Sequence, residues 1–560
     1  MIGKMLGWLT RASVLALVLA TAAQAQETPA PVATPIPTPT PGPEAARPTL
    51  SLSLQDAVAR TLENNLDIAV QRFEPEDQAE AVKQLRGFYD PLLTSTLRRA
   101  SSTEPARDVF SGGENVDSDF NTYDFGVRQN LPTGGAFQAD LTNGRTETTN
   151  ENVLFNPGFR SGLDLSVTQP LLRDFKIDSQ RLQLRIAKRN KDISDIQFRQ
   201  TVVNTIASVK QQYYDLIYSI DNLEAQRKSL ALASKLLDEN QIKVRVGTMA
   251  PLDVVAAESE VAGREEAVIV AEAVLYDAED ELRRAIFKDN AAENWMLRIV
   301  PSDRPSADPS PVDANAAVLS ALEKRTDVVA ARKNLENSYD NQTFARNQKL
   351  PAVDFVGTYG TTGQAGTRIL DQNGQPLAVP VTGGFGTALG DVFGRDVPTW
   401  SVGLQISYPI FNRAASASAA RARLSREQAE VSLRRLEIQV TQEVRSAARA
   451  VETNFKRVQS TQAARVLQER RLDAEQKRFN AGMSTNFLVT QSQRDLAVAE
   501  VAELRAMADY RKSIVNFERV QEAGGSNVSF TSSSSTAASG ARTTAGGTST
   551  TTGLTTPSGQ

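Results

Sequence analysis

The side chains that usually carry enzyme chemistry are missing from this sequence or scattered along it. The chain has no histidine and no cysteine, so Ser-His-Asp and Cys-His nucleophiles cannot form, and the common zinc, copper and haem ligand sets are missing. Carboxylates remain, but no pair of them stands out from the charged helix faces. The simplest interpretation of the acids on those faces is that they are solvated residues with Arg and Lys partners; they include Glu265, Glu266, Asp277, Glu279 and Asp280. We therefore predict no enzyme, no catalytic residue, no cofactor and no metal site.

The net charge excludes another class of partner. At 560 residues the chain is long enough for several domains, but its formal net charge is only -4 and its pI is near 5.5. A surface that binds nucleic acid needs a basic footprint. No nucleic-acid partner is therefore expected.

The first residues have the pattern of an export signal. Lys4 and Arg11 precede the apolar run SVLALVLATAA, and AQA at 23–25 is the small-x-small pattern at which a signal peptidase cleaves. No later run reaches about 18 apolar residues, so a membrane span would have to be a closed β-barrel. Composition then predicts three segments outside the folded part: a signal peptide at 1–25, a proline-rich linker at 26–48 and a disordered Ser/Thr/Gly tail at 524–560.

Two glycine breaks organise the rest of the chain. KVRVGTMAPLDV and RFNAGMSTNFLV centre on Gly247 and Gly482, and each follows more than seventy residues without glycine or proline. Those stretches, 171–246 and 410–481, are rich in Ala, Leu, Arg, Gln and Glu. Each is therefore predicted to be one helix of ~105 to 115 Å.

The two breaks belong to a duplication. LENNLDIA at 62–69 matches LEKRTDVV at 322–329, and the two glycine breaks match in the same order along the chain. The first repeat covers 49–300 and the second covers 301–523. Each has the order helix, strands, long helix, break and returning helix.

Each long helix is expected to lie antiparallel beside a stacked pair of shorter helices, because two short ones match one long one in length. The shorter helices are predicted at 55–86, 251–287, 313–348 and 486–522. Apolar residues at alternating spacings of three and four predict a coiled-coil seam. In the first long helix the seam is Ile206, Val209, Tyr213, Leu216, Ile220 and Leu223. In the second it is looser and comprises Val440, Val444, Ala447, Val451, Phe455 and Val458.

Strand signals stand between the helices. TWSVGLQISYPI at 399–410 alternates apolar with small or polar residues and has an aromatic near each end, which is typical of a lipid-facing strand. GLDLSVTQP at 162–170 repeats the alternation, and 351–360 is the expected antiparallel partner across a Gly-rich loop at 361–398. The strand region from Pro91 to Pro170 is longer by 21 residues than its counterpart from Pro351 to Pro409, and the surplus coincides with 124–147, a predicted β-hairpin turning at Pro132 to Gly135. This hairpin either extends an external loop or adds two strands per subunit.

The order of elements resembles that of the TolC-like outer membrane efflux proteins. The resemblance covers 50–523 and rests on RVGT and NAGM at the breaks, on SVTQPLL and ISYPIF where strands enter long helices, and on the repeat order. It implies a mainly α fold with a membrane β-barrel portion, in which two structural repeats of long coiled-coil helices and β-hairpins build a trimeric α/β tunnel. Each subunit of such a homotrimer supplies four strands to a twelve-stranded barrel.

The resemblance implies an export channel in the cell outer membrane of a Gram-negative bacterium, embedded in outer membrane lipid and with a large periplasmic part. Its partners would be a periplasmic adaptor protein and an inner membrane pump, in a tripartite efflux or type I secretion system. The alternative is that the chain is itself a periplasmic adaptor, which is also exported and based on a coiled coil. The sequence does not specify the cargo, because small molecules and proteins leave through similar channels.

The resemblance also assigns a role to the two breaks. It places them at the periplasmic tip of the channel, where the adaptor would dock. The alternative is that each glycine only ends its helix, which is the commonest role of glycine there. The docking residues would be Val246, Gly247, Thr248, Ala481, Gly482 and Met483.

The channel gate is where the sequence departs from the family. Some members have aspartates six and nine residues after the second-repeat glycine, and here those positions hold Leu488 and Gln491. We therefore expect a hydrophobic and amide-lined constriction, with Leu488 as a steric gate and Phe479 near the aromatic position of the family's gating network. The first repeat keeps an acid at the sixth position, Asp253, either as a gate residue or as the N-terminal cap of the next helix.

Overall fold

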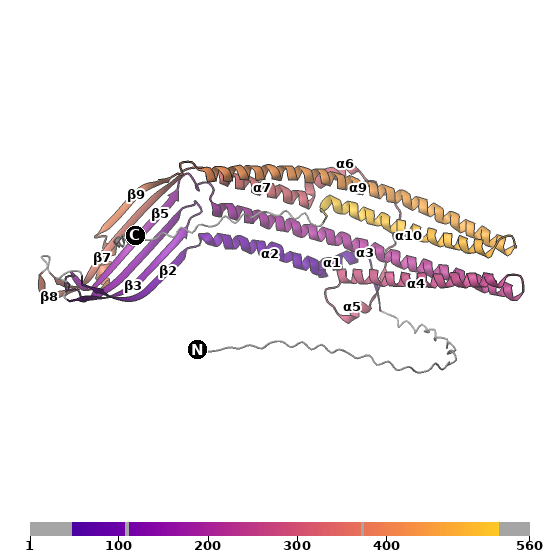
Figure 1. The fold of residues 1–560 in the computed structure, drawn as a ribbon, viewed down its shortest axis with the longest axis horizontal. Coiled ribbons are helices and arrows are strands. Elements are labelled where there is room, and N and C mark those ends of the chain that lie inside the picture. Colours follow the sequence, from indigo (N-terminus) through magenta and orange to yellow (C-terminus); the bar gives the residue numbers. More distant parts are fainter. Residues whose placement is uncertain (1–47, 107–110, 112, 371–374, 526–560) are drawn as a thin grey trace, which may run out of the picture. The chain divides into compact units, whose positions relative to one another are not determined.

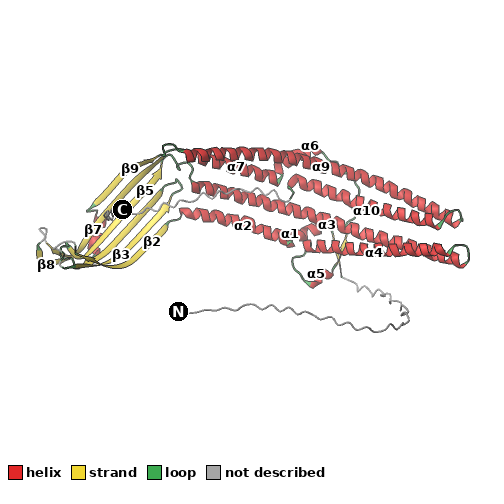
Figure 2. Cartoon of the chain, viewed as in Figure 1, coloured by secondary structure: helices red, strands yellow, loops and turns green. Residues whose placement is uncertain are grey.

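The computed structural model describes residues 48–106, 111, 113–370 and 375–525, which belong to one compact unit beginning at Pro48. The signal peptide, nearly all of the linker and the tail beyond 525 fall outside the described residues. Helices and strands are segregated, with the long strands gathered at one end of the helices (Figures 1 and 2). None of the described helices is both long enough and apolar enough for a membrane span.

The helices of the first repeat pack along its long helix. They are α1 (Leu54–Asn64), α2 (Leu66–Arg86), α3 (Ser179–Arg245) and α4 (Pro251–Ile286). α3 has 67 residues, which gives it a length of about 100 Å. Because α1, α2 and α4 all contact α3, the expected packing of a long helix beside shorter ones is confirmed.

The second repeat has the same arrangement. Its helices are α6 (Ala314–Lys324), α7 (Thr326–Asn347), α9 (Arg413–Asn480) and α10 (Asn486–Glu522). α6, α7 and α10 contact α9, which has 68 residues. The two repeats join through α3, which packs on both α7 and α10.

The first helix of each repeat is divided, so the single helices predicted at 55–86 and 313–348 are wrong. The divisions fall at Asn65 and Arg325, which are equivalent positions of the duplication. Asn65 has extended backbone, and its Oδ1 accepts hydrogen bonds from two N–H groups of α2, at 3.0 and 3.2 Å. It therefore caps α2 at the point where α1 ends.

Arg325 fixes the equivalent division in the second repeat. Its buried guanidinium lies 3.0 Å from the carboxylate of Asp327 and 2.6 Å from that of Glu443 on α9. The long helices also begin later than predicted, at Ser179 and Arg413. The first begins there because the side chain of Asp178 caps it, accepting from a backbone N–H at 2.7 Å.

The predicted seams are buried. In α3 the buried seam residues are Val209, Tyr213, Leu216 and Leu223. In α9 they are Val440, Val444, Ala447, Val451 and Val458. Because each fully buried large apolar side chain contributes roughly 1.5–3 kcal/mol, these seams are a major source of stability for the helical part.

A short parallel strand pair ties the start of the described chain to the join between repeats. β1 (Thr49–Leu52) pairs with β6 (Arg298–Pro301), which follows the short helix α5 (Ala292–Met296). The buried hydroxyl of Tyr213 on α3 donates to the carbonyl oxygen of Leu52 at 3.0 Å. This contact anchors the pair against the middle of α3.

The remaining strands form one antiparallel sheet of seven. They are β2 (Leu92–Pro105), β3 (Asn115–Asn130), β4 (Ala136–Thr148), β5 (Phe155–Pro170), β7 (Ala352–Leu370), β8 (Pro376–Thr382) and β9 (Pro398–Ser407). The order across the sheet is β2, β3, β4, β5, β7 and β9, and β8 pairs with the outer part of β7. In the described part of a single chain β2 and β9 each leave one edge unpaired, so this sheet does not close on itself.

The strands predicted at 162–170, 351–360 and 399–410 are confirmed as part of β5, the first half of β7 and β9, although β7 begins at Ala352 and β9 already ends at Ser407. The loop expected at 361–398 is wrong, because β7 continues to Leu370 and is followed by β8 and by α8 (Phe385–Gly394). α8 lies against the sheet, where Gly363 has no side chain to collide with the carbonyl of Ala388. Residues 371–374 within that range lie outside the described residues.

The hairpin predicted at 124–147 is present and adds two strands to the sheet, β3 and β4. Their turn contains Pro132 and Gly134, and the latter has φ +87°. The first repeat therefore supplies four long strands and the second supplies two, β7 and β9. The four strands per subunit that the resemblance implied are replaced by six long ones.

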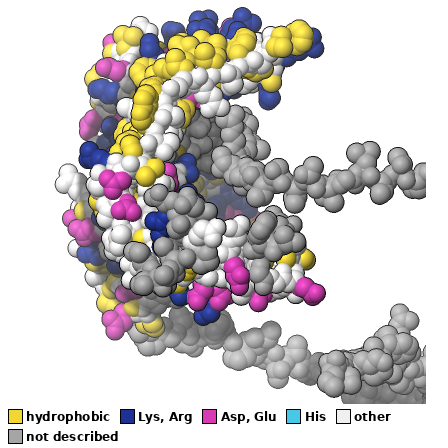
Figure 3. All heavy atoms as spheres, turned by 90° about the vertical axis from the view of Figure 1, so that its left-hand side faces the viewer, with side chains coloured by type: hydrophobic (Ala, Val, Ile, Leu, Met, Phe, Trp, Pro, Cys, Tyr) yellow, Lys and Arg dark blue, Asp and Glu magenta, His cyan; other side chains and the backbone are white. Residues whose placement is uncertain are grey.

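The sheet has one apolar and one mainly polar face. Residues alternate between faces along a strand, and directly paired residues share a face. Thus Leu93, Val127, Ala139 and Leu165 form one apolar row, and Trp400 pairs with Tyr359 on the same face. In the view of Figure 3, onto the sheet end, hydrophobic side chains gather in a patch in the upper part.

The opposite face is lined by small and polar residues. Gly126, Asp140, Asp164 and Gly360 form one row across β3, β4, β5 and β7. The apolar face of the outermost strands is exposed in the single chain, with the side chains of Leu97 and Trp400 both 71% accessible. A large exposed apolar surface of this kind marks a contact with lipid or protein.

Candidate functional site: the helix breaks and the contacts behind them

The two helix breaks have the same backbone structure. α3 and α4 form the first hairpin, which turns at Gly247, and α9 and α10 form the second, which turns at Gly482. Both glycines have positive φ, +81° and +76°. In each, the N–H after the glycine donates back five residues, Thr248 to Lys243 and Met483 to Arg478, both at 2.9 Å. Each break is therefore a Schellman helix end, in which glycine supplies the left-handed residue.

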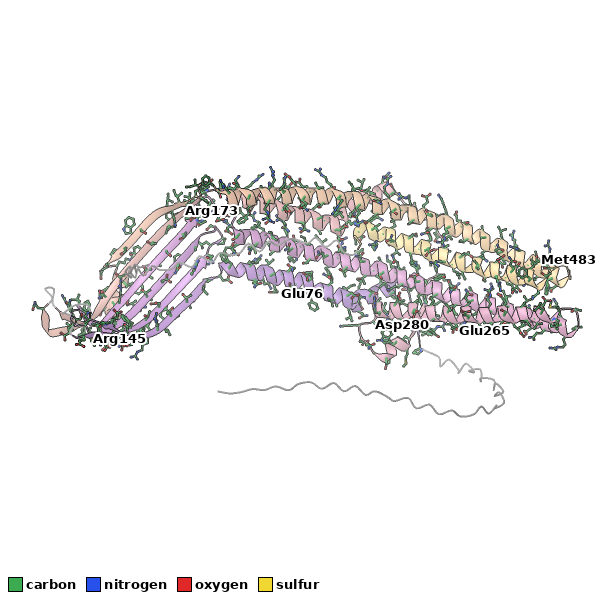
Figure 4. The ribbon with its side chains drawn as sticks, in the orientation of Figure 1. Glu76, Arg145, Arg173, Glu265, Asp280 and Met483 are labelled. Atoms are coloured by element: carbon green, nitrogen blue, oxygen red, sulfur yellow. The ribbon has the colours of Figure 1, made fainter. Side chains whose placement is uncertain are left out.

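The two turns are open to solvent. A Cβ added at Gly247 or Gly482 would meet nothing within 4 Å, and Val246 and Met483 are 71% and 74% exposed. Figure 4 labels Met483 at the end of the second hairpin farthest from the sheet. The sequence analysis missed one further shared feature, an exposed apolar residue five positions after each glycine. These residues are Leu252 and Phe487, 77% and 70% exposed.

The residues expected at the gate have different environments. Leu488 and Gln491 are exposed on α10. Asp253 is not the N-terminal cap of α4, because the cap position is Ala250 and Asp253 lies in the first turn. Its carboxylate there is favoured by the helix dipole. The cap alternative for Asp253 is therefore wrong.

Phe479 is buried between the two hairpins rather than exposed. It shares a core cluster with Leu236 of α3 and with Val489 and Leu496 of α10. The ammonium of Lys243 lies 3.7 Å from the centre of its ring, which is a cation–π contact from the first hairpin to the second. The aromatic ring therefore joins the hairpins directly behind the breaks.

A chain of buried amides forms a second connection. Asn240 of α3 is fully buried, and its Nδ2 donates to Oδ1 of Asn486 at 2.8 Å. The Nδ2 of Asn486 in turn donates to the backbone carbonyl oxygen of Asp253 at 3.3 Å. These bonds tie α3, α10 and α4 together at the first turn of both returning helices.

A buried carboxylate forms the third connection, about two helical turns further from the tip. Glu260 of α4 is only 8% exposed and accepts hydrogen bonds from Nε of Arg494 on α10 at 2.7 Å and Nε of Arg264 at 2.8 Å. Burial alone would raise the pKa of Glu260, but the two guanidinium groups outweigh it and hold that pKa below its ordinary value. Glu260 is therefore an anion that links the two hairpins.

Sequence reasoning missed these links because their partners are far apart in the chain, 246 positions for Asn240 and Asn486 and 234 for Glu260 and Arg494. One signal was present. Asn240 continues the buried series Ala233 and Leu236 at spacings of three and four, so it is a polar residue at a seam position. Such residues often specify a partner in coiled coils.

The described residues around the breaks show no arrangement for bond-making chemistry. Two exposed helix turns of the same backbone structure lie at the ends of two hairpins, and a ring, an amide chain and a carboxylate join the hairpins behind them. Most of these links are polar contacts that a partner could exchange for others. The arrangement suits a docking surface coupled to a change in hairpin spacing.

Comparisons with known proteins agree with this architecture. The family model described as outer membrane efflux protein matches residues 136–286 and 318–520. The chain is 24% identical over 218 residues to the outer membrane protein TolC of Vibrio cholerae, a match that covers 37% of this chain. It has the fold of the outer-membrane channel OprN, with a TM-score of 0.60, 17% identity and coverage of 84% of this chain and 90% of that one. The CmeC outer membrane channel of Campylobacter jejuni gives a TM-score of 0.58 at 17% identity, with coverage of 84% and 85%.

The sequence match with the Vibrio cholerae protein spans about half of that protein's length, 49%. The family model, in contrast, covers more than half of this chain and reaches into both repeats. In the first repeat its match begins at β4, so α1, α2, β2 and β3 precede it. The chain belongs to the outer membrane efflux protein family.

Proposed function

We propose that three copies of this chain form a channel in the outer membrane that exports solutes from the periplasm, together with a periplasmic adaptor and an inner membrane pump. Membership of the efflux family supports this function. The match across both repeats favours the channel over the alternative of a periplasmic adaptor. The helical part then lies in the periplasm and the sheet lies in the membrane.

The observation that carries the proposal is the two-faced sheet with its free edges. The apolar face of the outermost strands is exposed in the single chain, and within the part of the chain that the structure describes the unpaired edges of β2 and β9 leave backbone N–H and C=O groups without strand partners. In lipid such groups must be paired. Pairing β9 of one copy with β2 of the next satisfies them and continues the apolar face from subunit to subunit.

Pairs of cysteines test this edge pairing, and the absence of natural cysteine makes the test clean. Leu97 lies on the apolar face of β2, and Val402 and Leu404 lie on the apolar face of β9. Because paired residues share a face, Leu97→Cys combined with Val402→Cys or Leu404→Cys should give a covalent trimer on oxidation. The matched control is Leu97→Cys with Gly403→Cys, whose residues lie on opposite faces. Monomers in all three variants would overturn the trimeric arrangement.

We propose that the adaptor docks on the two exposed turns, Val246 to Thr248 and Ala481 to Met483. The two turns have the same backbone structure, and each is followed by an exposed apolar residue, Leu252 or Phe487. Both features support a docking role in addition to the ending of a helix. Exposed apolar anchors of this kind often dominate the energy of an interface. Photo-crosslinkers at positions 248 and 484 should capture one periplasmic protein, and Met483→Lys with Phe487→Lys should abolish that capture without lowering the unfolding temperature. Equal capture by the double variant would show that these turns only end helices.

We also propose that the narrow end of the channel is closed by Leu488 and Gln491, with Asp253 of the first hairpin nearby. The exposure of Leu488 and Gln491 in the single chain leaves them available to face the other subunits. Phe479 contributes from behind this constriction, because it is packed between the hairpins. A change in hairpin spacing would therefore move Phe479 and the constriction together.

A further inference from the structure

Among the elements that the structure describes, β3 and β4 are the only long strands of the sheet that no helix continues. α2 leads into β2 and α7 leads into β7, while β5 leads into α3 and β9 leads into α9. The helices and the strands joined to them follow the same order across the molecule, because α3 lies between α2 and α7 and α7 contacts α9. We call β3 and β4 the inserted strand pair. It lies between the strands joined to α2 and α3.

The inserted strand pair is part of the sheet and not an appendage. β3 pairs with β2 without interruption from Leu92↔Arg128 to Pro105↔Asn115, and β4 pairs with β5 from Ala136↔Thr168 to Thr146↔Gly158. Both faces continue through it. Phe125 of β3 and Leu141 of β4 extend the apolar face, while the polar face continues through small and charged residues.

The turn of the inserted strand pair is held where helices meet strands. The hydroxyl of Thr133 donates to the side-chain oxygen of Gln169 at 2.7 Å, and the Nδ2 of Asn130 donates to the carbonyl oxygen of Phe88 at 3.0 Å. Gly134 packs so closely that an added Cβ would come within 2.7 Å of the Asp174 carbonyl oxygen. These contacts fix the turn between the end of α2 and the start of α3.

The number of strands matches the width of the helices that adjoin them. Packed helices lie ~8–10 Å apart, so α2, α3, α7 and α9 together span about 32–40 Å. Strands ~4.8 Å apart and tilted by ~35–45° each occupy about 6–7 Å of a closed wall. Six strands therefore span about 35–41 Å, whereas four would span only about 23–27 Å. With four strands the wall would narrow by about a third where it enters the membrane.

We propose that the inserted strand pair widens the membrane section of the channel, so that the outer opening is not the narrowest point and passes bulky hydrated solutes. This proposal rests on the trimeric channel argued above. Six long strands from each of three chains close a wall of eighteen strands, and wall diameter grows roughly in proportion to strand number. The size limit for cargo then lies at the helical tip, and the polar face of the inserted strand pair lines the passage.

Single cysteines along β4 test whether the inserted strand pair lies in the wall. In trimers reconstituted into lipid vesicles, a charged water-soluble maleimide should label Gln138→Cys, Asp140→Cys and Thr142→Cys. Cysteines at the alternate positions should react with the maleimide at least tenfold more slowly than these, because they face lipid. The variants are Phe137→Cys, Ala139→Cys and Leu141→Cys. Equal labelling of both series would overturn the proposal, since it would place the strand pair in water on both sides.

Deletion of the inserted strand pair tests whether it sets the width of the membrane section. Removing residues 115–148 joins β2 to β5, and pairing Leu93 with Leu165 keeps both faces in place because these residues already share a row. End-on electron micrographs of the deleted trimer should show a membrane section with about two-thirds of the original diameter. The largest neutral polyethylene glycol that enters from the outer side should be smaller by a similar factor. An unchanged diameter and polymer limit would contradict the proposal.

The two proposals fail in distinguishable ways. If Leu97→Cys with Val402→Cys or Leu404→Cys gives no covalent trimer in the intact chain, the channel itself is wrong. If that cross-link forms in both the intact and the deleted chain but the diameters agree, only the widening is wrong. Should the deleted chain fail to fold, the labelling pattern of β4 in the intact chain still decides between the two arrangements.

Discussion

Arg494→Ala should separate the two hairpins at their tips. Arg494 of α10 donates through Nε to the buried Glu260 of α4 at 2.7 Å, and this ion pair is one of three connections behind the breaks. A hydrogen bond to a charged group contributes roughly 1.5–3 kcal/mol. Because the side chain of Arg494 is 60% exposed, solvent screening reduces the contribution of this ion pair to the joined state of the tips to about 1–1.5 kcal/mol. Since 1.4 kcal/mol is a factor of ten, the ratio of separated to joined tips should rise about tenfold.

The assay is a distance measurement between spin labels at Val246→Cys and Met483→Cys, both of which are exposed. The chain has no other cysteine, and labelled chains would be diluted with unlabelled ones so that each trimer reports one pair. Arg494→Ala and Glu260→Gln should both add a longer distance to the distribution and increase single-channel conductance. Arg471→Ala is the matched control, because its partner Asp495, at 3.2 Å, belongs to the same hairpin.

The same link should respond to acid. The pKa of Glu260 is lowered in the folded chain from an ordinary value of 4.5. The ionised carboxylate therefore stabilises the joined tips above that value, and the stabilisation is lost as pH falls through the lowered pKa. Acidification through this lowered pKa should lengthen the distance in the parent chain and have little further effect in Glu260→Gln. Identical distributions in the parent, Arg494→Ala and Glu260→Gln at neutral pH would refute the reasoning.

Further substitutions test the role of the glycine breaks, of the gate and of the division between α6 and α7. Gly247→Ala and Gly482→Ala should each lower the free energy of unfolding by about 1 kcal/mol, measured by thermal unfolding, because both glycines have positive φ. Gly263→Ala inside α4 should instead raise that free energy, because an added Cβ there meets nothing within 4 Å. A change of the same sign in all three variants would contradict this account. Leu488→Ala should raise channel conductance without creating a block by divalent cations, and a divalent block that Leu488→Ala leaves unchanged would instead indicate a carboxylate gate. Arg325→Ala should lower the free energy of unfolding by about 3 kcal/mol, because it leaves Asp327 buried without its guanidinium partner. Denaturant unfolding would measure this change. A decrease of less than about 1 kcal/mol would show that the division at Arg325 does not depend on the charge pair.

The parts of the fold that the sequence predicted are those set by local pattern. The glycine breaks, the returning helices and the alternation of β9 depend on residues within a few positions of one another, and duplication showed each of the helical features twice. The division at Arg325 was missed because it depends on a partner elsewhere, Glu443, which lies 118 positions away. α8 was missed because a Gly-rich stretch is usually a loop, whereas here one glycine of that stretch, Gly363 of β7, lets the helix lie close against the strand.

In the candidate site, too, the features set by local pattern were predicted and those that depend on distant residues were not. The exposed tip residues were found because a glycine break is visible in the sequence, but the contacts behind them were not. Phe479 was expected near the gate, and its burial is explained by Leu236 and Lys243, which come from the other hairpin. Only Asn240 left a local trace, as a polar residue in an apolar seam.

The two repeats keep the same backbone at the tip but differ in what they add to it. Both breaks end in the same Schellman turn and expose an apolar residue five positions later, so the backbone structure of the tip is common to the two repeats. Six positions after the glycine the first hairpin has Asp253 and the second has Leu488. The link from Asn486 to Asp253 uses the backbone carbonyl of Asp253 and not its carboxylate. Joining the hairpins therefore does not require an acid at that position, and we propose that the difference between Asp253 and Leu488 acts instead on the solute in the constriction.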